Sequence, residues 1–127
     1  MTDESIAADV FQQLQKATAS DPAELAGLYR DYLAEAHQAL AQLHSALARK
    51  DGEHLRERAH YMRGSSLIVG ASAVARCCAN LELMGRKSEF HGAARLLDQA
   101  SAALATAEAE LAKRLGPLVF PANGSAA

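Results

Sequence analysis

Residues that build β-sheets, disulfide frameworks and metal sites are scarce in this sequence. It has no Trp, aromatic residues make up 5% of its 127 residues, and β-branched residues form no long run. The only cysteines, Cys77 and Cys78, are adjacent, so a disulfide between them on a helix would be strained, and their spacing does not fit a zinc site. We therefore expect an all-α protein in a reducing compartment, with at least one of these cysteines buried.

An excess of charge of one sign is also lacking. The 13 Lys and Arg residues against 15 Asp and Glu give a net charge of -2, and no basic block is interleaved with aromatic residues, which excludes a typical nucleic-acid-binding surface. No segment approaches the roughly 18 consecutive apolar residues that a membrane span needs. The acidic start, Met1-Thr2-Asp3-Glu4, differs from the positively charged start of a secretory signal. We expect a cytoplasmic protein that binds neither nucleic acid nor membrane.

The sequence contains no recognisable site of its own for ATP or a metal ion. It has neither a glycine-rich phosphate loop of the Walker kind nor an acidic cluster placed to hold Mg²⁺. His37 and His44 share one face of a predicted helix, but no Glu-x-x-His pair accompanies them, so no metal site is predicted. His54 and His91 lie near predicted helix starts, where we expect them to be solvated.

Alanine and leucine at helical spacing dominate instead, and they predict five helices at about residues 4–18, 21–50, 52–70, 71–85 and 88–115. Asp21-Pro22-Ala23-Glu24 combines an N-cap, a first-turn proline and a capping-box glutamate. Asp51-Gly52 predicts the turn into the third helix, and Gly116-Pro117 ends the last one. The apolar faces of the first two helices are predicted to comprise Ile6, Val10, Leu14, Ala17, Leu25, Leu28, Tyr32, Leu33, Leu40, Leu43 and Leu47.

Short connections require consecutive long helices to be antiparallel. We therefore expect an all-α fold, an antiparallel up-down four-helix bundle with an additional N-terminal helix covering one end. The bundle domain is predicted at residues 1–116, and residues 117–127 are expected to form a disordered tail.

His60 is the side chain in the third predicted helix that stands out. Buried positions recur there at spacings of three and four, and at about 100° per residue His60 points roughly a quarter-turn away from them. Gly64 lies one turn further on, beside His60, although glycine in an exposed helix is roughly 1 kcal/mol less favourable than alanine. Without a Cβ at Gly64, a partner's backbone can approach the imidazole closely. The predicted buried positions of this helix are Leu55, Ala59, Met62, Ser66 and Val69.

The stretch Ala59-His60-x-x-Arg63-Gly64-Ser65-Ser66-x-x-x-Gly70-Ala71 resembles the signature of histidine-containing phosphotransfer (HPt) domains. The downstream stretch Cys78-x-x-Leu81-Glu82-x-x-Gly85-Arg86 is similar to the segment that follows it in that family, and the resemblance covers about residues 21–115. In one departure, Arg63 occupies the position where the family usually has lysine. The charge is kept, but the hydrogen-bonding geometry changes.

The resemblance implies a phosphocarrier rather than an enzyme, with no cofactor of its own. His60 would carry a phosphoryl group between aspartates of two receiver domains, one in a hybrid sensor kinase and one in a response regulator of a bacterial two-component phosphorelay. Mg²⁺ would be supplied by the receiver. Arg63 would neutralise charge at the phosphoryl group, and Gly64 would give clearance. On the same outward arc of the helix, Arg56 is a candidate for steering and Leu67 for apolar docking.

Two other functions remain open at this point. The first is an interaction module that binds a receiver domain without phosphotransfer. The second is the dimeric phosphotransfer bundle of a sensor kinase, in which each of two chains contributes a helical hairpin. A single chain here has enough long helices to close a bundle, so we expect a monomer.

Overall fold

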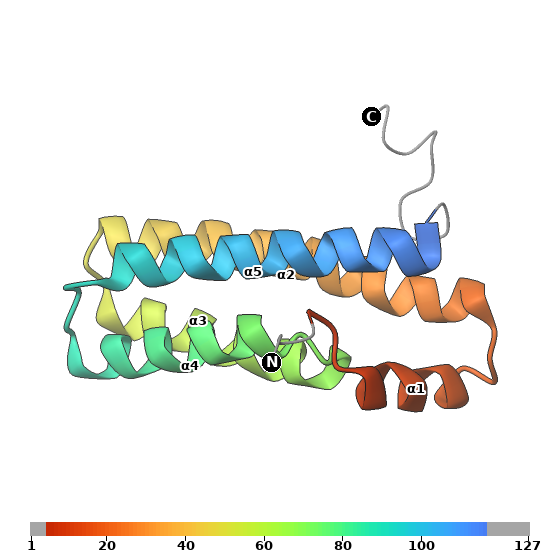
Figure 1. Cartoon of the computed structure of the whole chain (residues 1–127). Helices are drawn as coiled ribbons and strands as arrows, with labels where there is room; N and C mark the ends of the chain where they lie inside the picture. The colour runs from red at the N-terminus through yellow and green to blue at the C-terminus, as the bar shows by residue number, and fades with distance from the viewer. Residues whose placement is uncertain (1–4, 117–127) are drawn as a thin grey trace.

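The computed structural model of the chain describes residues 5–116. Within them the chain forms five α-helices: α1 (Ala8–Ala17), α2 (Pro22–Ala48), α3 (Gly52–Val69), α4 (Ser72–Lys87) and α5 (Ala93–Leu115). Figure 1 shows α2 beside α5 in one layer and α3 beside α4 in the other, with α1 at the end where α2 begins and α3 ends. The predicted four-helix bundle with an N-terminal helix at one end is confirmed.

The helix starts follow the local sequence closely. The Asp21 carboxylate accepts a hydrogen bond from the Ala23 N–H at 3.0 Å, and the Asp51 carboxylate accepts one from the His54 N–H at 3.0 Å, so both residues cap helices as predicted. The α3 helix ends at Gly70, whose φ of 84° is left-handed, as is common at helix ends. These boundaries depend on residues within one turn of each other, which is why the sequence predicts them well.

The start of α5 differs from the prediction. We expected it near Ser88, but α4 extends to Lys87 and α5 begins only at Ala93. Ser88 has a φ of 52° and Gly92 a φ of 84°, and a right-handed helix cannot run through two left-handed residues. Phe90, which the predicted range 88–115 places in the last helix, therefore lies in the connection and is half-buried against the core.

The first two helices also depart from their predicted apolar faces. The α1 helix begins at Ala8, and its predicted start at Glu4 lies outside the described residues, as does the predicted tail at 117–127. Phe11 is its buried position, and Thr18, which follows the helix as its C-cap, is buried as well, whereas Ala17 is exposed. In α2, Leu28 is exposed although its spacing predicts burial.

The core connects the two layers through apolar packing and a few hydrogen bonds between α2 and α3. The Tyr29 hydroxyl donates to the Val69 carbonyl at 3.0 Å, and the Tyr32 hydroxyl lies 2.8 Å from the Ser66 hydroxyl. Burial raises the pKa of Tyr32 to about 12. All five positions predicted to be buried in α3 are buried: Leu55, Ala59, Met62, Ser66 and Val69.

The cysteines behave as small helix residues. Both are free; Cys78 is buried, as expected for at least one of the two, and Cys77 is half-buried. Burial raises the pKa of the Cys78 thiol to about 12, which keeps the thiol protonated and unreactive at neutral pH.

Two glycines bring α3 and α4 unusually close. A Cβ at Gly85 would lie 2.5 Å from the backbone nitrogen of Arg56 and 2.6 Å from the Gly52 carbonyl oxygen. A Cβ at Gly52 would lie 2.7 Å from the Gly85 carbonyl oxygen. Any larger residue at either position would push the helices apart. Gly85 lies one turn from Glu82, so this close approach positions Glu82 against α3.

In the described part of the chain, no helix is long and apolar enough to cross a membrane.

Candidate functional site

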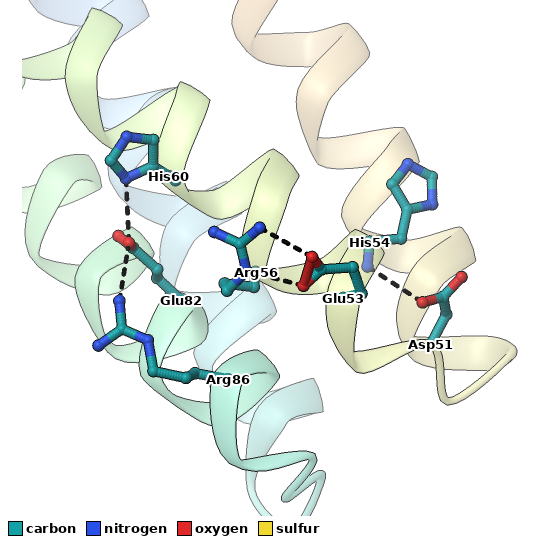
Figure 2. Close-up of polar contacts among 7 residues, drawn as sticks. All are labelled: Asp51, Glu53, His54, Arg56, His60, Glu82 and Arg86. Atoms are coloured by element: carbon teal, nitrogen blue, oxygen red, sulfur yellow. Dashed lines mark hydrogen bonds and ion pairs between the residues drawn. The ribbon is translucent and has the colours of Figure 1, made fainter.

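His60 projects from the outward side of α3, and 61% of its side chain is exposed. Its Nδ1 atom lies 3.0 Å from the Oε2 atom of Glu82 on α4 (Figure 2). An ionised carboxylate can only accept a hydrogen bond, so Nδ1 carries the proton in this pair. In the neutral imidazole the opposite ring nitrogen, Nε2, then carries the lone pair, and Figure 2 shows this nitrogen on the side of the ring away from Glu82.

Glu82 is a buried acid surrounded by basic side chains. Only 9% of its side chain is exposed, and the ion-pair distances are 3.5 Å from Arg63 Nε to Oε1 and 3.5 Å from Arg86 Nη2 to Oε2. Within residues 5–116, no hydrogen-bond donor reaches the buried Oε1 atom. A carboxylate is stable in a buried position only when positive charge or hydrogen-bond donors lie nearby. His60, Arg63 and Arg86 fill that role around Glu82.

From the sequence, neither Glu82 nor Arg86 is predicted to lie beside His60; both belong to the stretch that is similar to the HPt family, and Arg86 is expected only to favour the end of its helix. Glu82 lies one turn after Cys78 and one turn before Gly85, on the face that α4 buries. A charged residue on a buried helix face is rare unless it is paired. The position of Glu82 on such a face therefore indicates that it has a partner. The sequence could not identify the partner, because His60 lies on another helix.

Gly64 is exposed beside His60, as predicted. A Cβ placed there would meet no heavy atom within 4 Å, so packing within the described chain does not require glycine at this position. The contrast with Gly52 and Gly85 is direct, since a side chain at either of those would collide with backbone. The open space above Gly64 is available to a partner.

Arg56 and Leu67 are arranged differently from each other. The Arg56 guanidinium donates two hydrogen bonds of 2.9 Å to the Glu53 carboxylate, which Figure 2 shows on the side of Arg56 away from His60. The hydrogen bond from Arg56 lowers the pKa of Glu53 below its usual value. Leu67 is exposed one turn beyond Gly64. Arg63 therefore shares the acid of His60, while Arg56 is occupied by an acid of its own.

Two of the remaining histidines, His37 and His54, have side-chain partners. His37 Nε2 lies 2.7 Å from Glu108 Oε1, and His54 Nδ1 lies 2.7 Å from Arg49 Nη2. His54 is half-buried and contacts Arg49 at the protein surface, and His91 is exposed, as predicted. Among residues 5–116, no three His, Cys, Asp or Glu side chains are grouped to hold a metal ion.

Comparisons with known proteins agree with this geometry. The model of the family described as "Hpt domain" matches residues 27–113. The crystal structure of histidine-containing phosphotransfer protein B (HptB) from Pseudomonas aeruginosa PAO1 is similar, with a TM-score of 0.83 and 25% sequence identity over 90% of this chain and 96% of that chain. No curated protein matches the sequence. The residues matched by the family model include the α3–α4 hairpin that carries His60 and Glu82.

Proposed function

The chain belongs to the Hpt domain family and is a histidine phosphotransfer protein of a phosphorelay, and we propose that His60 is the residue that carries the phosphoryl group. The observation that carries this assignment is the hydrogen bond between Nδ1 and Glu82, which leaves Nε2 free and exposed. An imidazole held in one tautomer presents its nucleophilic nitrogen in a fixed direction.

The transfer step can be written for the Nε2 atom. Its lone pair attacks the phosphorus of a receiver's phosphoaspartate, the P–N bond forms, and the P–O bond to the aspartate breaks, releasing that carboxylate. Positive charge then develops on the imidazole, whose Nδ1–H still faces the Glu82 carboxylate. In the second transfer, an aspartate carboxylate of another receiver attacks the phosphorus. The new P–O bond forms, the P–N bond breaks, and His60 returns to its starting state.

Arg63 and Gly64 support this step in different ways. Arg63 lies between the acid and solvent and offers a guanidinium to the phosphoryl oxygens, and charge stabilisation of this kind dominates phosphoryl transfer. Gly64 leaves room for the partner's backbone beside Nε2. Leu67 offers an apolar contact. We assign no direct contact with the phosphoryl group to Arg56, because Glu53 already binds it.

Hpt domains are phosphocarriers that interact with receiver domains. For this chain, the proposed partners are the receiver of a hybrid sensor kinase and that of a response regulator, with Mg²⁺ bound by the receiver. We further propose that the protein is cytoplasmic and monomeric. The monomer is supported by helices α2–α5, which close a bundle within a single chain. The division into a domain at 1–116 and a tail at 117–127 stays a prediction.

The proposal is tested by offering the chain phosphorylated receiver domains from a panel and mapping the label by mass spectrometry. We expect one acid-labile phosphoryl group, located on His60. His60→Gln should abolish labelling with an unchanged helical circular-dichroism spectrum. His37→Gln is the matched control, because it removes another exposed histidine hydrogen-bonded to a glutamate, and it should be labelled normally. Acid-labile phosphate persisting in His60→Gln would contradict the assignment.

A further inference from the structure

A cavity of about 450 Å³ lies at the end of the bundle where α1 meets the start of α2 and the end of α5. The buried side chains of Phe11 and Leu25 line it, together with the half-buried Leu115. A cavity of about 150 Å³ is enough to hold a benzene molecule. The cavity beside α1 therefore has room for two large side chains, and its apolar lining favours apolar ones.

The attachment of α1 to the bundle depends on a few contacts around this cavity. The Phe11 ring stacks on the Tyr29 ring with their centroids 5.8 Å apart, and the Arg114 guanidinium carbon lies 4.7 Å from the Phe11 centroid. Before the helix begins, the Ala7 N–H donates a hydrogen bond of 2.9 Å to the Gly70 carbonyl. Figure 1 shows the end of α5 and the start of α2 at the end of the molecule where α1 lies. Anything that fills the cavity would join α1 to both of these helices.

The chain leaves α5 at the edge of the same cavity. Leu115 lines the cavity and is the last residue of α5, and Gly116, with a φ of 47°, ends the helix there. The sequence that follows is Pro117-Leu118-Val119-Phe120-Pro121, which has three large apolar residues in a row. An extended chain spans about 3.3 Å per residue, so Phe120 can lie up to about 17 Å from Leu115. The cavity is within reach of this segment.

The pattern of the segment suits an extended chain with one apolar face. Proline disfavours helical conformation in the residue before it, which is Phe120 ahead of Pro121, and the β-branched Val119 also favours an extended backbone. Alternate side chains of an extended chain point to the same side. Leu118 and Phe120 would then share one side, with Val119 on the other, and two large apolar side chains are what the cavity can hold.

We propose that residues 117–121 fold back over the end of the bundle and place the side chains of Leu118 and Phe120 in the cavity between α1, α2 and α5, with Val119 towards solvent. The segment holds α1 against the bundle, and the disorder expected for the tail begins after Pro121. The Hpt family model matches residues 27–113 and includes neither α1 nor this segment. The inference does not depend on the proposed function of His60.

Thermal unfolding of the full-length chain, followed by circular dichroism, is the first test. Phe120→Ala should lower the Tm by about 5 °C, because a buried apolar side chain is lost. Val119→Ala is the matched control, since it shortens an apolar side chain on the opposite side of the same segment, and it should change the Tm by less than about 2 °C. A wild-type Tm in Phe120→Ala, or equal losses in the two variants, would overturn the proposal.

The second test locates the Phe120 ring by nuclear Overhauser effects in the full-length chain. Its ring protons should show these effects with the Leu25 methyl groups and the Phe11 ring. If Phe120→Ala lowers the Tm but the wild type shows no such effects, the ring packs elsewhere and the proposal is wrong. A sample that mixes labelled and unlabelled copies identifies the donor of the segment. Effects that arise between copies would mean that a second chain fills the cavity, which also contradicts the proposal.

Transfer kinetics separate this inference from the proposed function. His60 is not among the residues that line the cavity, so Phe120→Ala, measured below its Tm, should accept the phosphoryl group from a phosphorylated receiver at the wild-type rate. Slower labelling of a folded Phe120→Ala chain would place the segment near His60 and overturn the proposal. Labelling of a residue other than His60 in the wild type would contradict the proposed function alone.

Discussion

His60 and His37 each lie within hydrogen-bond distance of a glutamate carboxylate, but they present different nitrogens to solvent. His60 uses Nδ1, the nitrogen nearer its own backbone, and leaves Nε2 free at the outer edge of the ring. His37 uses Nε2 to contact Glu108 and leaves the inner Nδ1. Both pairs consist of a histidine and a glutamate. Which ring nitrogen contacts the carboxylate decides whether a large phosphodonor can reach the other ring nitrogen.

The two acids differ as much as the two imidazoles. The Glu82 side chain is 9% exposed and has two arginines at ion-pair distance, whereas the Glu108 side chain is 27% exposed. One turn beyond the histidine, the first pair has Gly64 and the second has Ala41. On the proposed function, the buried acid with its two arginines orients the imidazole, and the open space at Gly64 leaves room for a partner. His37 is also exposed and also contacts a carboxylate, so these two features alone do not distinguish the environment of His60.

The largest effect that would sharpen the comparison is expected from Gly64→Gln. A side chain in the open space beside Nε2 should displace the partner's reacting atoms and slow transfer by about 100-fold, since misplacement by roughly 1 Å can have an effect of that size. Transfer rates from a phosphorylated receiver measure it, and circular dichroism checks the fold.

Two controls accompany this prediction. Ala41→Gln introduces the same side chain beside His37 and should leave transfer unchanged. Gly64→Ala should stabilise the chain by up to about 1 kcal/mol in denaturant unfolding, because alanine favours the helix. A wild-type transfer rate in Gly64→Gln would show that clearance is not the reason for this glycine.

A smaller effect is expected from removing the buried acid. Glu82→Ala should lower the transfer rate at saturating receiver by about 10-fold, because a hydrogen bond to a charged group is worth about 1.5–3 kcal/mol and 1.4 kcal/mol corresponds to tenfold. Glu82→Gln keeps an acceptor oxygen for Nδ1–H and should retain most of the rate. Glu108→Ala is the matched change in the other pair and should have no effect.

The nitrogen NMR shifts of His60 distinguish a positioning role of Glu82 from general damage to the fold. In the wild type they should report a proton on Nδ1, and in Glu82→Ala a mixture of the two tautomers. If Glu82→Ala slows transfer while the tautomer stays fixed, Glu82 acts in some other way than by orienting the imidazole.

The smallest effects are expected at Arg63, whose side chain is partly exposed. Arg63→Lys should retain most of the transfer rate, Arg63→Ala should lose about 5-fold, and Arg63→Glu should lose more, in line with the modest strength of exposed charge pairs. High salt should compress this order, because exposed charges are screened. Rates for the three variants at two salt concentrations decide it. Equal losses in the lysine and alanine variants would instead indicate that the planar guanidinium makes paired hydrogen bonds.

Several features of the site could be predicted from the sequence because they depend on one helix alone. The outward direction of His60 and the position of Gly64 beside it follow from the spacing of buried residues in α3. The caps at Asp21 and Asp51 follow from residues within one turn. The start of α5 was missed because two residues in left-handed conformation, Ser88 and Gly92, interrupt a pattern that otherwise reads as helical.

By itself, then, the sequence determined the helices, the bundle class and the exposed histidine, because backbone hydrogen bonds and helical periodicity are local. Only the tertiary structure decided which side chains meet. Glu82 lies against His60 because Gly52 and Gly85 allow α3 and α4 to approach closely, and Leu28 is exposed because α2 and α3 leave a groove between them. Distances between helices depend on packing across the whole core, and no spacing within one helix encodes them.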